Sequence, residues 1–453
     1  KIRADEHIGM KTRHERSGCV RRIGIGFLSL ALLLFGAAPL QAQTRVLTLD
    51  EALAIAGEKN RDIEKAKEYI AWARGKVVEE RAAAFPQLTA LASLGWDQDK
   101  SQKIYSPLQT QRTERRTALV GVSQPLFTWG QVSAAIRAAK VGLQSAEEQL
   151  RVYRQAARRD VSAAFYDVLL VRELHALALH NYDQKKRHRD EARRRLQAGV
   201  ATDFDVLAAE VAVENARPEV IRTENQIRTA RERLRFLLAY EGGEVDASGR
   251  LEAEFGPSRS YDEAFALARE KRPDLADIRR RIEVCRELVT LAASQDKPRV
   301  DLKGAYGWNY LEQPSAAGDG PSWNVGIQLS YPFFDGLRAR GRVAQAESDL
   351  RRIRVEEARQ IDAIALEIRD AVNAVRESEE IVLALAGTVG QAERLLVMAE
   401  KGYELGVKTR LEVEDAELNL RQAKSSLSRA RRDVLVARVN LDWVTGILGE
   451  EER

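Results

Sequence analysis

The chain has 453 residues, and 44% of them are hydrophobic, which is typical of a folded protein and too many for a disordered one. The formal net charge of +4 comes entirely from the first 42 residues, which hold seven Lys/Arg and three Asp/Glu. The rest of the chain carries 65 charges of each sign. A neutral body of this kind gives no electrostatic basis for nucleic acid as the partner.

Residues 1–42 have the features of a secretory signal peptide. Arg21 and Arg22 precede an apolar run over residues 23–34, and small residues lead from there to Ala42. We expect export with cleavage near Ala42; a transmembrane anchor is the alternative, but the apolar run is short for one. No cysteine directly follows the run, so we expect no lipid anchor. One cysteine beyond the leader, Cys285, leaves no intrachain disulfide.

The remaining chain is an internal duplication. Residues 49–56 match residues 261–268 at an offset of 212, and the same offset pairs Trp96 with Trp308. Further along, an offset of 207 pairs Gln124-Pro125-Leu126-Phe127 with Tyr331-Pro332-Phe333-Phe334, Gly199 with Gly406, Thr202 with Thr409 and Glu210 with Glu417. We therefore expect a first repeat over 43–240, a linker over 241–259, a second repeat over 260–449 and a tail over 450–453.

Each repeat is predicted to hold a helix, two strands, a very long helix and a last helix. Long tracts rich in Ala, Leu, Arg and Glu, with apolar residues three and four apart, predict the helices. They cover Asp50–Ala84, Gln131–Ala198 and Asp203–Ala239 in the first repeat, and Asp262–Asp296, Leu337–Leu405 and Arg410–Thr445 in the second. Pro218 predicts a local kink that has no counterpart in the second repeat.

Strict alternation of apolar and polar residues predicts four strands, over about 87–97, 117–127, 299–310 and 322–334. One face carries apolar residues such as Leu94, Val120 and Trp308, while Lys303 and Asn324 lie on the other. A soluble sheet can alternate in this way too. Segments of about ten residues with aromatic residues toward their ends suit membrane-spanning strands better.

These elements place two demands on the assembly. Four strands cannot close a barrel in lipid, so several copies must share one barrel. The long helices extend about 100 Å, so they must project away from the membrane. Prolines stand at all four joints between helices and strands, where a fixed φ and a missing N–H can redirect the chain: Pro86, Pro125, Pro298 and Pro332.

The duplicated unit, the two strand-to-helix joints and the two Gly-containing turns resemble the TolC-type outer-membrane efflux proteins over essentially Thr48–Gly449. The resemblance implies a mainly α-helical fold with a membrane β-barrel, in which four strands per chain enter a shared twelve-stranded barrel that continues into a long periplasmic α-helical barrel. It also implies a homotrimer in the outer membrane of a Gram-negative bacterium. That trimer would dock to a periplasmic adaptor (membrane fusion protein) and an inner-membrane pump for efflux or type I secretion.

The resemblance also assigns roles to the two turns after the long helices. Thr202, Asp203, Tyr403 and Lys408 look like a periplasmic gate, with Tyr403 and Lys408 as partners of Asp203, and Glu412 and Asp415 look like an acidic entrance ring. The alternative is that these carboxylates simply favour helix N-termini, where they are stabilised anyway. Gly199 and Gly406 permit the turns.

Catalytic motifs are lacking in the sequence: there is no Gly-x-Ser-x-Gly, no phosphate-binding glycine loop and no cysteine pair. His175 and His180 are five residues apart and thus on different helix faces, so a metal site is a weak hypothesis, and we expect no cofactor. The basic run Arg187–Arg195 is typical of a solvated helix face, with an adaptor-docking surface as the alternative. An exported periplasmic coiled-coil adaptor or scaffold is the rival to the channel, and an enzyme is disfavoured.

Overall fold

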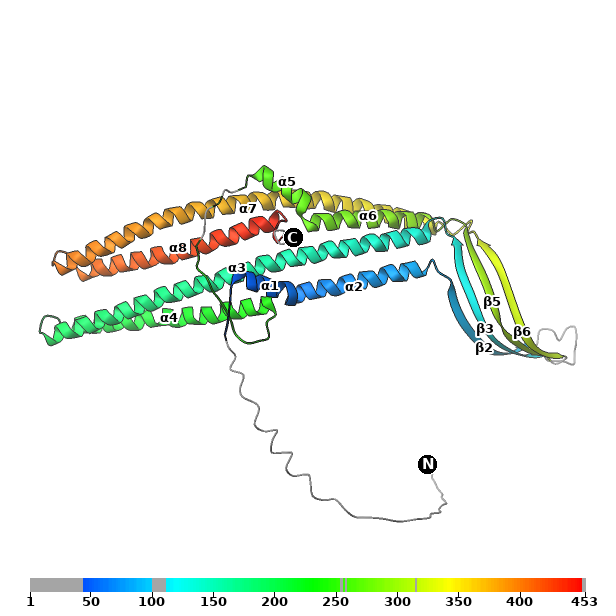
Figure 1. Cartoon of the computed structure of the whole chain (residues 1–453), viewed down its shortest axis with the longest axis horizontal. Helices are drawn as coiled ribbons and strands as arrows, with labels where there is room; N and C mark the ends of the chain where they lie inside the picture. The colour runs from blue at the N-terminus through cyan, green and yellow to red at the C-terminus, as the bar shows by residue number, and fades with distance from the viewer. Residues whose placement is uncertain (1–43, 100–110, 253–255, 257–258, 314–315, 450–453) are drawn as a thin grey trace, which may run out of the picture. The chain divides into compact units, whose positions relative to one another are not determined.

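The computed structural model describes residues 44–99, 111–252, 256, 259–313 and 316–449 (Figure 1). The expected signal peptide (1–42) and tail (450–453) lie outside the described residues. The first repeat contains α1 (Leu49–Lys59), α2 (Arg61–Ala82), β2 (Gln87–Asp99), β3 (Gln111–Phe127), α3 (Gln131–Gln197) and α4 (Asp203–Leu238). The second contains α5 (Tyr261–Lys271), α6 (Pro273–Ala293), β5 (Arg299–Gln313), β6 (Ala316–Ser330), α7 (Arg338–Glu404) and α8 (Arg410–Val444).

The first helix of each repeat is divided in two, so the prediction of one continuous helix there is wrong. Asn60 has an extended backbone and ends α1, and its side chain then accepts hydrogen bonds from the N–H groups of Asp62 and Ile63 to cap α2. In the second repeat Pro273 is the first residue of α6. A proline forces the residue before it out of the helical conformation, which ends α5 at the equivalent place.

The segment 241–259, expected to be a linker, contains a buried strand. β4 (Val245–Ala247) pairs in parallel with β1 (Arg45–Leu47), which precedes the first helix. Leu47, Val245 and Leu251 are fully buried against α3 and α4 residues in one apolar cluster. Three-residue strands are too short to produce an alternating pattern, so hydrophobic periodicity could not reveal them.

The four long strands form one antiparallel sheet in the order β2-β3-β5-β6. The strands exceed their predicted lengths at the ends far from the helices. β6 covers residues 316–330 rather than 322–334, because the chain leaves the sheet before Pro332, where Phe333 N–H donates to the carbonyl of Tyr331. Pro125 lies inside β3, at a shift of register between Pro125 and Phe127.

The helices pack in the same order as the strands. On the sheet side α2 packs against α3, α3 against α6 and α6 against α7; on the other side α4 packs against α3, α3 against α8 and α8 against α7. Figure 1 shows α3 and α7 running unbroken from the sheet to the far turns. Pro218 lies within α4, which continues through it. The layer therefore has α2 and α4 along one edge and α7 along the other.

Candidate functional site

The two turns after the long helices are built alike. Gly199 and Gly406 have φ angles of 76° and 74°, in the left-handed region that glycine adopts without strain. Each turn is followed by a capping box: Thr202 Oγ1 accepts from Asp205 N–H, and Thr409 Oγ1 accepts from Glu412 N–H. The cap carboxylates Asp205 and Glu412 are thus equivalent by the 207-residue repeat.

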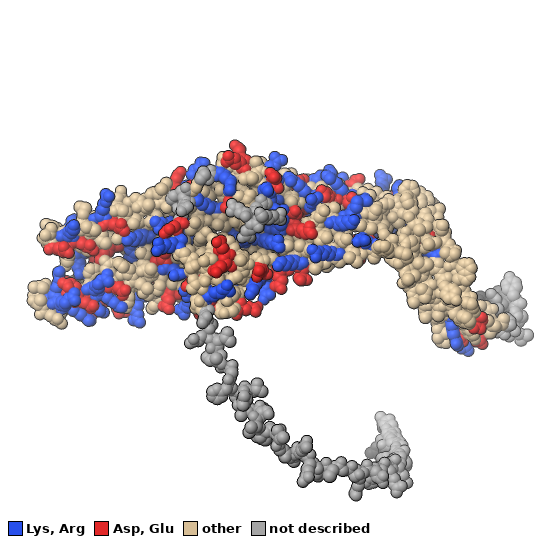
Figure 2. Space-filling view, in the orientation of Figure 1, with Lys and Arg blue, Asp and Glu red and all other residues tan. Residues whose placement is uncertain are grey.

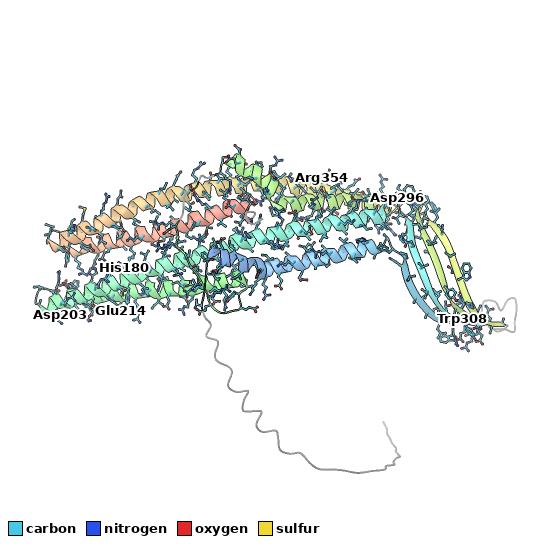
Figure 3. All side chains as sticks on the ribbon, in the orientation of Figure 1. His180, Asp203, Glu214, Asp296, Trp308 and Arg354 are labelled. Carbon is cyan, nitrogen blue, oxygen red and sulfur yellow. The ribbon has the colours of Figure 1, made fainter. Side chains whose placement is uncertain are left out.

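The partners expected for Asp203 are bonded elsewhere within the described chain. Tyr403 accepts a hydrogen bond from Arg195 Nη1 at 2.9 Å, and Lys408 pairs with Glu412 one turn away on its own tip. Asp203 lies exposed at the end of the α3–α4 hairpin, where Figure 3 labels it. Within one copy the described contacts of Tyr403 and Lys408 are with Arg195 and Glu412, so their pairing with Asp203 stays a prediction.

The two residues expected in the acidic ring differ in their surroundings. Glu412 is held by Lys408 and by the backbone N–H of Thr409, and these bonds lower its pKa to about 2. Its carboxylate is therefore charged at any physiological pH, but Lys408 compensates part of that charge. Asp415 is exposed one turn further along α8. The N-terminal capping role that we weighed as the alternative is observed for Glu412.

A polar cluster that the sequence did not predict lies between α3 and α8, a few helical turns from the two Gly-containing turns. Gln184, Lys185 and His188 of α3 all bond the carboxylate of Glu417, which is 8% exposed. One signal in the sequence could have located it: Glu417 occupies a position on the apolar face of α8 that also contains Val413, Ala416 and Leu420. An acidic residue in such a stripe needs a partner when it is buried.

The three histidines of the described residues, His175, His180 and His188, do not gather into a metal site. His175 Nδ1 lies 2.9 Å from Thr223 Oγ1, and His188 belongs to the Glu417 cluster. His180 lies on α3 (Figure 3), in a groove that α3 shares with α7 and α8. Among the residues that the structure describes, no group of three or more His, Cys, Asp or Glu side chains could hold a metal ion.

The sheet carries a continuous apolar face. Ala90, Val120, Tyr306 and Trp323 lie side by side across all four strands, and Ala92, Ala118, Trp308 and Pro321 form the next row. Trp323 and Val325 are 73% and 66% exposed within one copy. Figure 2 shows few charged side chains over the sheet until its far end, whereas charges are dense over the helices. An apolar face left open to this extent suits lipid rather than water.

The opposite face of the sheet is mostly polar or small, with Leu91 and Leu119 as apolar exceptions. Thr89, Gly121, Ala305 and Asn324 make one row, and Lys303 and Gln328 follow on the same face. The apolar face ends at a charged row toward the strand ends that lie far from the helices. There Arg116 pairs with Glu114 at 2.6 Å and lies over the Tyr310 ring. Alternation between an apolar and a polar face is the pattern of a barrel strand with lipid outside and water inside.

The joints between helices and strands differ in detail. Pro86 and Pro298 each directly precede a strand, β2 and β5. Pro332 follows β6, and the αL residues Gly336 and Leu337 then redirect the chain into α7, whose first N–H groups are capped by Asp335. Each proline therefore lies near one end of a strand: two lie just before it, one just after it, and Pro125 lies within β3.

The model of the family described as outer membrane efflux protein matches residues 52–240 and 265–447, which is more than half of the chain. The chain belongs to this family. It is 23% identical to outer membrane protein TolC of Vibrio cholerae over 394 residues, which cover 83% of this chain and 85% of the relative. It is 25% identical to the cobalt-zinc-cadmium resistance protein CzcC of Cupriavidus metallidurans over 409 residues, covering 88% and 90%.

Solved structures show the same fold. A membrane protein from Pseudomonas aeruginosa superposes with a TM-score of 0.77 at 23% identity, covering 88% of this chain and 92% of that one. CusC superposes with a TM-score of 0.76 at 18% identity, covering 89% and 93%. The resemblance inferred from the residues is confirmed, and the protein is an outer-membrane efflux or secretion channel of a Gram-negative bacterium with a periplasmic extension.

Proposed function

We propose that three copies of this chain close into a ring, with a shared twelve-stranded membrane barrel above a periplasmic α-helical barrel. The observation that carries the proposal is that sheet and helices share one order, β2-β3-β5-β6 above α2-α3-α6-α7. Both layers thus end in a first-repeat element on one side and a second-repeat element on the other. Head-to-tail contacts between such unlike edges generate closed rings when the rotation fits.

The strand edges supply the first reason for closure. β2 and β6 each have a neighbour on one side only among the described strands. Unpaired backbone groups are not tolerated in lipid, and four strands are fewer than the smallest known spanning barrels contain. Pairing β6 of one copy with β2 of the next removes every edge. Two copies would supply eight strands and three supply twelve, the number that the family resemblance implies.

The helix edges supply the second reason. α7 contains an 18-residue window that is apolar enough to cross a membrane, yet only 11% of it is buried within one copy. Leu366, Leu383 and Met398 of α7 are largely exposed, and so are Trp72 of α2 and Ile221 of α4 at the other edge. α7 is itself about 100 Å long and projects out of the lipid. Its apolar surface is therefore best buried against α2 and α4 of the next copy.

The turns supply a docking surface for the rest of the export system. Each turn carries two apolar side chains that are about three-quarters exposed: Val200 and Phe204 at one turn, and Leu405 and Val407 at the other. Exposed apolar side chains at the end of a helical hairpin mark an interaction site. A periplasmic adaptor (membrane fusion protein) would contact this end and link the duct to an inner-membrane pump.

A combined measurement of mass and conductance tests the assembly. The mature protein, extracted from membranes in detergent, is expected to have the mass of three chains and to give discrete current steps in planar bilayers. A particle of one or two chains would contradict the trimer. Full solubility of the folded protein without detergent, with no current steps, would favour the adaptor or scaffold hypothesis instead.

The entrance of the duct lies at the turns, where Thr202, Asp203, Tyr403 and Lys408 form the gate and Glu412 and Asp415 form the acidic ring. In the trimer Asp203 of one copy reaches the second turn of a neighbouring copy, because its own copy offers it no partner among the described residues. Exposed ion pairs of this kind are worth less than about 1 kcal/mol each, which suits contacts that must break on opening.

The double replacement of Glu412 and Asp415 by Ala is expected to reduce the preference of the open channel for cations, because it removes two carboxylates per copy from the entrance. Reversal potentials in a salt gradient measure this preference. Single-channel steps with an unchanged preference would remove both residues from the ring while leaving the channel itself intact.

The pH dependence provides a control. The pKa of Glu412 lies near 2, below its ordinary value of 4.5, so its charge is present above that ordinary value and is lost only as pH falls toward 2. The contribution of Glu412 to cation preference is therefore expected to persist in the parent from about pH 7 to about pH 5. A steep loss within that window would assign the preference to other groups.

A further inference from the structure

Glu417 connects the two helical hairpins of one chain. It lies on α8, and its partners lie on α3: Lys185 Nζ is 3.0 Å from Oε2, His188 Nε2 is 2.8 Å from Oε1, and Gln184 Nε2 donates to Oε1. The Glu417 side chain is 6% exposed and that of Lys185 is 16% exposed. A desolvated carboxylate is thus bonded by three side chains from the other hairpin.

The charge state of the cluster is set by these contacts. Burial alone would raise the pKa of Glu417, but the hydrogen bonds from His188 and Lys185 outweigh it, and the pKa lies below its usual range. Glu417 is therefore ionised in the packed arrangement. A buried ion pair contributes little net free energy, because the attraction between the charges and the cost of desolvating them nearly offset each other. Replacing one partner while the other stays buried is destabilising, because it leaves an uncompensated charge. Such a contact specifies one arrangement and still separates reversibly.

The repeat provides an internal comparison. Glu210, the equivalent of Glu417 in the first repeat, lies within its own hairpin, where it pairs with Arg193 at 2.6 Å and is partly exposed. At the positions 207 residues beyond Lys185 and His188 stand Ala392 and Leu395, which cannot form these bonds. The carboxylate of Glu417 therefore joins α8 to α3, whereas that of Glu210 pairs within its own hairpin.

Space for movement lies beside the cluster. A groove of about 790 Å³ between α3, α7 and α8 is lined by Glu417 and by a mixed set of charged side chains, including Glu173, Arg187, Glu400, Arg421 and Lys424. Lys185 is about 18 Å from the end of α3, from 12 residues at about 1.5 Å each. When α8 moves away from α3, water from the groove can hydrate both charges.

We propose that the Glu417, Lys185, His188 and Gln184 cluster is a latch that holds the α7–α8 hairpin against α3 and that must open before the periplasmic end of the channel widens. The inference rests on the proposed channel function and assigns it a further control point. Glu417 is a positioning residue here, since it acts on the arrangement of the hairpins and not on the cargo.

Single-channel recording of the mature protein in planar bilayers tests the latch. Glu417→Gln removes the charge and is expected to increase the fraction of time in the high-conductance state about tenfold, since the packed arrangement then leaves the ammonium group of Lys185 buried without its carboxylate partner. The matched control is Glu210→Gln, which removes the equivalent carboxylate from an exposed pair within one hairpin and is expected to leave the channel unchanged. Lys185→Met keeps the aliphatic stem and is expected to resemble Glu417→Gln.

A second control separates gating from stability. Asp167 of α3 pairs with Arg432 of α8 at 2.6 Å, also between the hairpins but far from the turns, so Asp167→Asn is expected to lower thermal stability without raising conductance. Equal conductance of the parent, Glu417→Gln and Lys185→Met would overturn the latch, as would an equal increase in Glu210→Gln or Asp167→Asn. Absence of current steps in the parent would instead overturn the proposed function.

Discussion

An arginine in place of Val325 is expected to destabilise the protein folded in lipid, lowering its free energy of unfolding by about 2–4 kcal/mol per copy. Val325 lies on the apolar face of β6, in the same row as Val122 of β3, and it is 66% exposed within one copy. A guanidinium at this depth must be desolvated or must pull water into the bilayer. Denaturant unfolding from lipid vesicles measures the change, and the amount of protein inserted into membranes should fall with it.

Asn324→Arg is the matched control for this change. Asn324 is the preceding residue and lies on the polar face of the same strand, so in the proposed barrel an arginine there points toward the water-filled interior and is expected to cost less than about 1 kcal/mol. Equal effects of the two variants would mean that the apolar face does not contact lipid, and the barrel orientation inferred from the alternation would be wrong.

Arg272→Ala is expected to lower the free energy of unfolding by about 3 kcal/mol. Arg272 lies at the break between α5 and α6 and is 6% exposed; it bonds Asp274 and Glu367 at 2.6 Å each and the carbonyl of Val444. Removing a buried partner leaves carboxylates uncompensated, at a cost of about 3–5 kcal/mol. The low end applies because both carboxylates keep some contact with water. Denaturant titration followed by circular dichroism measures it.

Arg281→Ala on the same helix is the comparison for that variant. Arg281 lies 3.9 Å from Glu356, and both side chains are about half exposed. Exposed pairs typically contribute less than about 1 kcal/mol, so this variant should unfold close to the parent. If Arg272→Ala also unfolded close to the parent, the buried ion-pair network at the helix break would not be a source of stability.

The sequence predicted most of the elements because each carries a strong periodic signal. The long helices α3 and α7 repeat their apolar pattern over many turns, and both strand pairs alternate strictly. The breaks at Asn60 and Arg272 were missed because a single extended residue does not disturb the apolar period on either side of it. Pro273 was nevertheless a visible signal, since proline disfavours helix in the residue before it.

The candidate site was harder to predict than the fold. Capping boxes at Thr202 and Thr409 are local patterns that sequence can reveal, and their acidic third residues, Asp205 and Glu412, follow from the repeat. The bond between Arg195 and Tyr403 and the cluster around Glu417 join segments more than 200 residues apart. Their partners depend on how the hairpins pack, which a one-dimensional period does not encode.

The unbroken course of α3 and α7 has a mechanical consequence. These two helices connect each turn directly to a strand, α3 to β3 and α7 to β6, whereas α4 leads into β4 and α8 into the final residues of the chain. A displacement of α8 at the periplasmic end is therefore not transmitted along a continuous backbone to the sheet. A displacement of α7, by contrast, is continuous with β6, so only the part of the motion that α8 carries alone leaves the sheet undisturbed.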